Sequence, residues 1–251
     1  MFDVAAEAYG RFMGRFAEPL AGPFADRAGV HPGMRALDVG CGPGALTAEL
    51  VRRLGPAAVA AIDPSPPFVA AVRSRFGEVD VREGVAEQLP FPNGSFDIVL
   101  AQLVVHFMTD PVAGLAEMRR VTRSGGRVAA CVWDHGGDGG PLSAFWRAAR
   151  DLDPEAPDES TMAGVREGHL VELSQAAGLT EIEPSTLVVR VGFASFDQWW
   201  EPFLLGVARV GAYLGQLDAR RIAALRDHCM EVMPAAPFTV EASAWCVVGR
   251  V

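Results

Sequence analysis

The stretch ALDVGCGPG, residues 36–44, decides the fold that the sequence predicts. It begins as an apolar run that contains one aspartate, Asp38, and it ends with Gly40, Gly42 and Gly44 within five positions. Glycine adopts positive φ angles and permits close approach to the backbone, at a cost of roughly 0.5–1 kcal/mol when it replaces alanine in regular structure. Three spaced glycines after a strand therefore predict a tight turn into a helix, with a ligand lying against the main chain.

Short apolar runs alternate with helical segments on both sides of this turn. Runs rich in Val, Ile and Leu predict strands, and the segments between them have helical spacing, a pattern typical of a parallel sheet covered on both faces. The predicted strands are residues 36–39, 58–62, 79–82, 96–101, 127–133, 180–193 and 238–250. The predicted helical segments are 2–28, 45–54, 66–76, 112–123, 166–177 and a long stretch over 195–233.

Composition excludes several classes of protein. The chain has a formal net charge of -9, and its 22 basic residues are all arginines spread along the sequence. Nucleic-acid binding depends on clustered basic residues, so no nucleic acid is expected as a partner. The four cysteines lack CxxC spacing, which predicts a reducing, cytoplasmic compartment. No signal peptide is evident, and the apolar stretch near 96–108 is too short for a bilayer, so we expect no membrane contact.

Two classes of ligand fit the glycine-rich turn. Residues 40–45 read as GxGxxA, and Asp63 follows at about the twenty-residue spacing of a dinucleotide-binding fingerprint. The same spacing serves S-adenosylmethionine, whose ribose also presents two hydroxyls to a carboxylate. Asp38 favours the second ligand, because a carboxylate before the turn opposes a pyrophosphate and attracts a sulfonium and an ammonium group. Asp38 can also accept hydrogen bonds from amides of the turn, and the two roles are compatible.

Four stretches in a fixed order carry more specific information. They are ALDVGCGPG (36–44), AAIDPSP (60–66), GVAEQLPFPNGSFDIVLAQ (84–102) and MRRVTRSGGRVAACVW (118–133). Together they resemble the class I S-adenosylmethionine-dependent methyltransferases, in particular the small-molecule branch that includes the ubiquinone/menaquinone C-methyltransferases.

The resemblance implies an α/β fold with a Rossmann-like, doubly wound, seven-stranded and mostly parallel sheet. It also implies an antiparallel C-terminal hairpin, N-terminal helices and a helical lid insertion. We expect one methyltransferase domain over residues 1–251, composed of three parts. These are an N-terminal helical cap (1–33), a cofactor-binding core (34–135), and substrate-side helices with the final strands (136–251).

The resemblance also implies a role for each matching residue. The glycines of the turn lie under the methionine part of the cofactor, Asp63 binds the ribose, Ala86 borders the adenine, and Gln102 lies beside the methionine. The residues expected to contact S-adenosylmethionine, or its product S-adenosylhomocysteine, are Tyr9, Arg15, Asp38, Gly40, Cys41, Gly42, Gly44, Asp63, Pro64, Val85, Ala86, Glu87 and Gln102.

Val85 departs from the family pattern, and Tyr9 and Arg15 extend the set to the N-terminal helix. Val85 stands where many relatives have an acidic residue or Asn, so Glu87 or a backbone carbonyl is expected to contact the exocyclic amine of adenine. The stretch YGRFMGR, residues 9–15, resembles the leading helix of the family, in which Tyr9 and Arg15 would close over the cofactor carboxylate. Alternatively, both side chains only shape the helix surface.

Methyl transfer is an in-line displacement whose leaving group departs neutral, so the protein chiefly aligns the reactants and excludes water. Such positioning can be worth about 7–11 kcal/mol, and no nucleophilic residue is required. A general base helps when the acceptor is protonated at neutral pH. His106, in QLVVHFM, is the best placed candidate, and His135 is a second choice. His106 can instead pack against the pocket wall or cap a helix.

The remaining motifs limit the class of substrate that is expected. Asp134, His135 and Asp138 lack further clustered carboxylates, so no metal site is predicted. Residues 101–104, AQLV, replace the Asn/Asp-Pro-Pro-aromatic motif with which many nucleic-acid and protein-amide methyltransferases hold a planar amine. The aromatic segment 195–214 predicts either an apolar lid or plain core.

These observations predict a monomeric or homodimeric enzyme that methylates O, N or C of a small, hydrophobic or aromatic molecule. The alternatives are an S-adenosylmethionine-binding accessory protein without transfer activity and an NAD(P)-dependent oxidoreductase.

Overall fold

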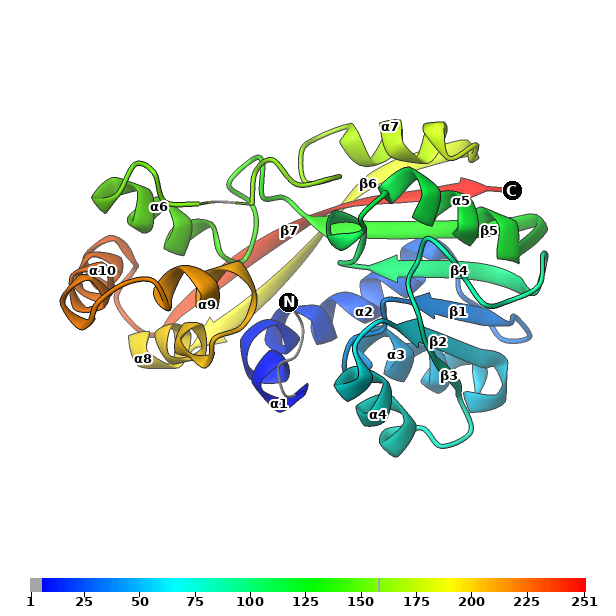
Figure 1. Ribbon diagram of the computed structural model, residues 1–251, viewed down its shortest axis with the longest axis horizontal. Coiled ribbons are helices and arrows are strands. Elements are labelled where there is room, and N and C mark those ends of the chain that lie inside the picture. Colours follow the sequence, from blue (N-terminus) through cyan, green and yellow to red (C-terminus); the bar gives the residue numbers. More distant parts are fainter. Residues whose placement is uncertain (1–5, 158) are drawn as a thin grey trace.

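Seven strands form one sheet in the computed structural model, which describes residues 6–157 and 159–251. The sheet order is β3-β2-β1-β4-β5-β7-β6 (Figure 1). The strands are β1 (Ala36–Val39), β2 (Val59–Asp63), β3 (Asp80–Glu83), β4 (Phe96–Gln102), β5 (Thr122–Trp133), β6 (Thr180–Phe193) and β7 (Phe238–Arg250). Strands β1 to β5 pair in parallel, and β7 is antiparallel to both of its neighbours. The predicted Rossmann-like sheet with an antiparallel C-terminal hairpin is confirmed.

Helices cover both faces of this sheet. The α-helices are α1 (Ala6–Tyr9), α2 (Arg15–Ala28), α3 (Ala45–Leu54), α4 (Pro66–Arg75), α5 (Pro111–Val121), α6 (Ser143–Leu152), α7 (His169–Ala176), α8 (Phe196–Trp200), α9 (Ala208–Leu214) and α10 (Ala219–Val232). Shorter helical turns are the π-helix η1 (Gly10–Gly14) and the 3-10 helices η2 (Pro56–Ala58), η3 (Val105–Phe107) and η4 (Glu201–Leu205).

The alternation of side chains along each strand produces two cores. Ala36 of β1 belongs to the core that contains the buried faces of α2, α3 and α4. Leu37 and Val39 point the other way and pack with the buried residues of α5 and α7. Because the central strands are buried on both faces, they read as continuous apolar runs, and this explains why the sequence predicted them.

The C-terminal hairpin is longer than the parallel part of the sheet. β7 pairs with β5 from Ala244 to Arg250, whereas its pairing with β6 runs on to Phe238. The projecting half of the hairpin carries α6, α8, α9 and α10, on the left of Figure 1, and α1 with η1 lies between this helical region and α4. The N-terminal segment therefore reaches the edge of the sheet at which β1, β2 and β4 end.

Two parts of the helical region differ from the sequence-based prediction. The stretch 195–233 is not one long helix, because Pro202 opens a 3-10 turn, Gly206 has φ +74° and Asp218 caps a new helix. α6 was not predicted at all. It buries Phe145, Trp146, Ala148 and Ala149 on one side, but the Gly- and Pro-rich segments on either side of it conceal that spacing in the sequence.

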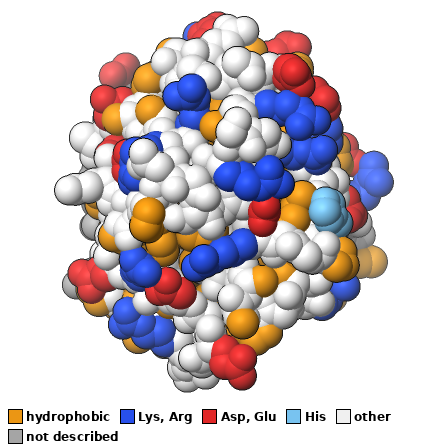
Figure 2. Space-filling view, turned by 90° about the vertical axis from the view of Figure 1, so that its right-hand side faces the viewer, with side chains coloured by type: hydrophobic (Ala, Val, Ile, Leu, Met, Phe, Trp, Pro, Cys, Tyr) orange, Lys and Arg blue, Asp and Glu red, His pale blue; other side chains and the backbone are white. Residues whose placement is uncertain are grey.

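Charges are mixed on the face that Figure 2 shows, the right-hand side of Figure 1, where arginines are interspersed with acidic side chains. At this end of the sheet Arg123 pairs with Asp97 across 2.5 Å, and Arg250 pairs with Glu181 across 2.8 Å. Exposed pairs of this kind contribute about 0–1 kcal/mol each. None of the described helices is both long enough and apolar enough to span a membrane.

Candidate active site

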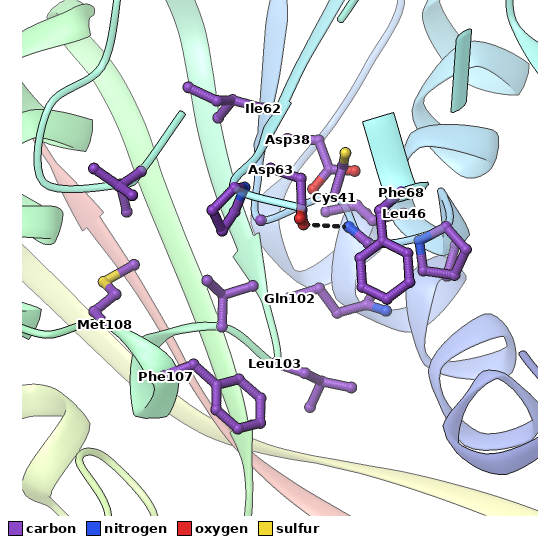
Figure 3. Close-up of a pocket in the computed structure, with 18 of the residues that line it drawn as sticks. Asp38, Cys41, Leu46, Ile62, Asp63, Phe68, Gln102, Leu103, Phe107 and Met108 are labelled. Carbon is purple, nitrogen blue, oxygen red and sulfur yellow. Dashed lines mark hydrogen bonds between the residues drawn. The ribbon is translucent and has the colours of Figure 1, made fainter. Parts of the chain in front are cut away.

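A cavity of about 370 Å³ lies where β1, β2 and β4 end (Figure 3). Open α/β sheets bind ligands at this edge, and the volume lies in the range of small-molecule sites. The predicted residues that line it are Tyr9, Asp38, Gly40, Cys41, Gly42, Asp63, Pro64, Val85, Ala86, Glu87 and Gln102. Arg15 and Gly44 are absent from the described lining. Sequence reasoning missed Ala17, Pro43, Ala45, Leu46, Ile62, Phe68, Gly84, Leu103, Val104, Phe107, Met108 and Thr109.

The glycine-rich turn is fixed to the end of β2. The backbone N–H groups of Gly40 and Cys41 both donate to Ile62 O, at 2.8 and 3.0 Å. Gly40 has φ +69°, and a Cβ atom there would lie 2.5 Å from Val104 Cγ2. Gly42 has φ +52° with open space around it. Gly44, with φ +96°, caps α3 from behind the cavity. The turn therefore requires glycine for its conformation and for close approach of a neighbour.

Asp63 joins the turn to the loop after β2. Its Oδ2 accepts a hydrogen bond from Gly42 N–H at 2.9 Å, and its Oδ1 accepts one from Ser65 N–H at 2.8 Å. Burial raises the pKa of this carboxyl, and the two backbone N–H groups act in the opposite direction. Each oxygen retains a lone pair. Asp63 can therefore hold the turn and accept a hydrogen bond from a ligand hydroxyl at the same time.

Asp38 occupies the wall on the β1 side. Its Oδ2 accepts a hydrogen bond from Thr47 Oγ1 at 2.6 Å. Burial, followed by the charge of Asp63, raises the pKa of Asp38 to about 7, against the lowering effect of the Thr47 hydrogen bonds. The amide of the turn is thus bound by Asp63 and not by Asp38. No motif pointed to Thr47, whose only signal was a hydroxyl in the first turn of the helix after the glycines.

Gln102 connects the cavity to the N-terminal segment. Its Nε2 donates to Ala17 O at 2.9 Å, whereas its Oε1 is buried and has no hydrogen-bond partner among the described residues. Buried polar atoms are nearly always paired in proteins. An unpaired amide oxygen in a cavity wall suits a ligand that carries N–H donors, such as an ammonium group.

Tyr9 and Arg15 have different places in the structure. Tyr9 lines the cavity, and its ring packs edge-on against Phe68 with centroids 5.4 Å apart. Burial and the charge of Asp63 raise the pKa of Tyr9 to about 12, so it remains a neutral donor. Arg15 instead donates through Nη1 to Gln198 O at 2.9 Å and stacks on Phe193. The intervening π-helix η1 and the packing of α2 on β6 direct Arg15 away from the cavity.

The side of the cavity that is expected to border adenine contains one exposed residue and one buried residue. Val85 is 45% exposed, and Ala86 is buried. Glu87 lines the cavity, but its Oε1 already accepts hydrogen bonds from Thr109 N–H and Asp110 N–H, at 2.7 and 3.2 Å. One carboxylate oxygen of Glu87 therefore fixes the loop that leads into α5.

His106 lies on η3 and lines a second cavity of about 30 Å³. Tyr9, Leu103 and Phe107 line both cavities. Figure 3 shows Leu103 and Phe107 on the side of the larger cavity opposite Asp38 and Asp63. Burial, followed by the charges of His135 and Arg209, lowers the pKa of His106 well below 6.5. His106 is therefore a neutral imidazole at neutral pH, the form that accepts a proton.

The aromatic segment 195–214 mostly forms core. Trp199, Trp200 and Phe203 are buried, and the rings of Trp200 and Phe203 pack against Phe145 of α6. In the described part of this segment, Ala208 alone lines the second cavity. In the ranges 6–157 and 159–251, no three His, Cys, Asp or Glu side chains converge in a way that could hold a metal ion.

Part of this chain is similar in sequence to known methyltransferases. Residues 37–130 match the family described as "Methyltransferase domain". Nocamycin O-methyltransferase of Saccharothrix syringae is 35% identical over 134 residues, which cover 51% of this chain and 48% of that protein. The ubiquinone/menaquinone biosynthesis C-methyltransferase UbiE of Burkholderia orbicola is 37% identical over 117 residues, covering 43% and 48%. The chain spans about half the length of these curated relatives.

A solved structure supports the fold over nearly the whole chain. The YcgJ protein of Bacillus subtilis superposes with a TM-score of 0.61 at 20% identity, covering 92% of this chain and 97% of that one. The match over residues 37–130, the four motifs and the order of the strands together show that this chain is similar to the class I S-adenosylmethionine-dependent methyltransferases.

Proposed function

We propose that this protein transfers a methyl group from S-adenosylmethionine to an oxygen, nitrogen or carbon atom of a small, hydrophobic or aromatic molecule. The observation that carries the proposal is the pair of carboxyl groups, Asp38 and Asp63, beside a glycine-rich turn in one cavity wall. In their ionised form these carboxyl groups favour a ligand with a positively charged sulfur, whose charge in turn lowers their pKa, and they oppose a diphosphate. This argues against the oxidoreductase alternative.

The residues present fit this cofactor. Asp63 would bind the ribose hydroxyls, the turn from Gly40 to Gly42 would lie under the methionine part, and the unpaired Oε1 of Gln102 would accept from its ammonium group. When bound, S-adenosylmethionine supplies a methyl group that is already activated by the positive charge on sulfur.

The chain itself would orient the acceptor, exclude water and remove a proton. Leu103, Phe107 and Met108 give the cavity an apolar wall opposite the two carboxyl groups. Such a wall excludes water and limits the orientations of an apolar acceptor, which is the main catalytic requirement of this displacement. We assign His106 as the general base, because it is buried and neutral. The cavity that it lines also shares three lining residues, Tyr9, Leu103 and Phe107, with the cofactor cavity.

Equilibrium binding tests the cofactor. We expect isothermal titration calorimetry to give micromolar-range affinity for S-adenosylhomocysteine and no binding of NAD. Binding of NAD without S-adenosylhomocysteine would refute the proposal. Transfer is then tested by incubating the protein and S-adenosylmethionine with phenols, amines, carboxylates and quinones, and by measuring S-adenosylhomocysteine by mass spectrometry. A protein that binds the cofactor tightly but releases no product from any of them is an accessory protein.

A further inference from the structure

The second cavity has polar features that the cofactor site does not use. Two buried side chains in its wall carry polar atoms without a hydrogen-bond partner among the described residues, Nδ1 of His106 and Nε1 of Trp133. The side chains come from η3 and from the end of β5, and the residues are 7% and 2% exposed. Leaving such an atom unpaired destabilises the folded protein, because the atom has lost its hydrogen bonds to water. A ligand that pairs both atoms would recover this free energy.

The two atoms have complementary chemistry. The indole N–H of Trp133 is only a donor, whereas Nδ1 of His106 is an acceptor when the imidazole proton is on Nε2. A hydroxyl group matches both, because it accepts through its oxygen and donates through its proton. The volume of about 30 Å³ suffices for a hydroxyl group and about one water molecule.

Further charged groups surround His106. The ring of His135 lies 6.0 Å from the His106 ring, and His135 Nδ1 lies 3.7 Å from Glu159 Oε2. His135 and Arg209 provide the positive charges that act on His106, and Glu159 supplies a negative charge beyond His135. Burial, reinforced by these positive charges, keeps His106 neutral, and the buried side chain of Glu159 lies beyond His135.

Leu103 marks the boundary between the two cavities. It is a non-glycine residue with φ +63°, directly after β4, and its N–H donates to Cys131 O at 2.8 Å. Such a conformation is strained for a residue other than glycine, and instances of it cluster at functional sites. It places an apolar side chain where the cofactor cavity meets the polar one.

We propose that the second cavity is the hydroxyl-binding part of the acceptor subsite, and that it selects a molecule with a weakly acidic hydroxyl group, such as a phenol, whose oxygen is bound between Trp133 Nε1–H and His106 Nδ1. This assignment rests on the proposed function and narrows its acceptor. In the reaction, the O–H bond breaks and its proton bonds to His106 Nδ1. The oxygen uses its electron pair to bond the methyl carbon, the C–S electron pair returns to sulfur, and the products are the methyl ether and neutral S-adenosylhomocysteine. His106 then releases the proton to water.

The binding part of the proposal is tested with phenol and toluene, which differ by the hydroxyl group, on the full chain saturated with S-adenosylhomocysteine. Indole N–H signals are followed by ¹H–¹⁵N NMR and assigned with Trp133→Phe and Trp146→Phe. Trp146 is the matched control, because its Nε1 is also buried without a partner among the described residues, yet it is not part of the described lining. We expect phenol to shift the Trp133 signal saturably, and toluene to leave it in place.

Affinity gives a second readout. Trp133→Phe should weaken phenol binding about tenfold, the effect of one net hydrogen bond, and Trp146→Phe should leave it unchanged. A Trp133 signal that ignores phenol, or moves equally with toluene, overturns the subsite. Failure of S-adenosylhomocysteine to bind, measured first in the same samples, would instead refute the proposed function.

The catalytic part is tested by the pH dependence of S-adenosylhomocysteine release from S-adenosylmethionine and phenol. We expect a flat kcat between about pH 7 and pH 9 in the wild-type protein, because His106 is already neutral there. In His106→Gln, kcat should be lower and rise about tenfold per pH unit as free phenolate forms, with unchanged affinity for S-adenosylhomocysteine. Equal profiles, or bound phenol that yields no product at any pH, overturn the role of His106 as base.

Discussion

Asp63 Oδ2 accepts a hydrogen bond from the backbone N–H of Gly42 at 2.9 Å, across 21 residues of sequence. The bond links the end of β2 to the glycine-rich turn after β1, so the residue expected to bind the ribose also supports the main chain under the methionine. One carboxylate thereby couples two parts of the proposed cofactor site. Removal of the Asp63 carboxylate should therefore affect both the ribose contact and the turn under the methionine.

Asp63→Ala should weaken S-adenosylhomocysteine binding by about 1–3 kcal/mol, because it leaves buried polar groups of protein and ligand unpaired. The measurement is isothermal titration calorimetry, with circular dichroism to verify folding. Asp97→Ala is the control, since Asp97 also accepts a backbone hydrogen bond, from Arg35 N–H at 2.7 Å, but does not line the cavity in the described structure. Unchanged affinity in Asp63→Ala would mean that the ribose is bound elsewhere.

Gly40→Ala and Gly42→Ala should separate backbone strain from steric clash. Both positions have positive φ, which costs about 1–3 kcal/mol for a residue other than glycine. Only at Gly40 would the new methyl group also meet Val104, at 2.5 Å. Urea denaturation should therefore show a larger loss of unfolding free energy for Gly40→Ala than for Gly42→Ala. Equal losses would show that Val104 can move aside at little cost.

Tyr9→Phe should lower affinity for S-adenosylmethionine, whereas Arg15→Met should not. Tyr9 lines the cavity and keeps its phenolic proton, because burial and Asp63 raise its pKa to about 12. Arg15 donates to Gln198 O and would instead lose a contact between α2 and α8. We expect a loss of about 1 kcal/mol in binding for the first variant and a similar loss in stability for the second. A weaker cofactor affinity in Arg15→Met would restore the sequence-based role of Arg15.

The different positions of Tyr9 and Arg15 in the structure illustrate what the sequence alone could predict. The strands and the glycine turn were predictable, because their signals are local: apolar runs buried on both faces, and glycines where φ is positive. The place of Arg15 was not predictable, since its direction depends on the π-helix η1 and on packing against β6 and α8. A local pattern does not reveal either cause.

The second cavity was beyond sequence reasoning for the same reason. Its wall combines the N-terminal segment, the loop after β4, the end of β5 and the loop near Glu159. His106 could be nominated from its place after a strand. Trp133 could not, because its significance lies in an unpaired Nε1 that only tertiary structure reveals.

Asp38 should make the protein less stable as the solution becomes more alkaline. Burial raises its pKa to about 7 in the folded state, so its contribution is full below the unfolded-state value of about 4 and is lost as pH rises through about 7. Asp38→Asn lacks this titration. Between about pH 5 and pH 8 the unfolding free energy of the wild-type protein should fall relative to the variant, by up to about 3 kcal/mol.

Urea denaturation at several pH values measures this difference. Asp197→Asn is a suitable control, because Asp197 is exposed and pairs with Arg226 at the surface of the helical region. A constant difference between wild type and Asp38→Asn over this pH range would contradict the buried, protonated form of Asp38.

His106 should have the opposite effect on stability. Burial, His135 and Arg209 lower its pKa well below 6.5 in the folded state. Its contribution is therefore full above about pH 6.5, and is lost as pH falls below that value, because the unfolded chain binds a proton that the folded chain excludes. Relative to His106→Gln, the wild-type unfolding free energy should fall by about 1–2 kcal/mol between about pH 7 and pH 5.

The histidine on the protein surface supplies the control for this prediction. His228 pairs with Asp151 across 3.0 Å, and that hydrogen bond raises its pKa, so its contribution to stability is present at low pH and decreases as pH rises. His228→Gln should thus change the pH dependence in the opposite sense from His106→Gln. If both variants shift the curve in the same direction, His106 is protonated in the folded protein and is not available as a base.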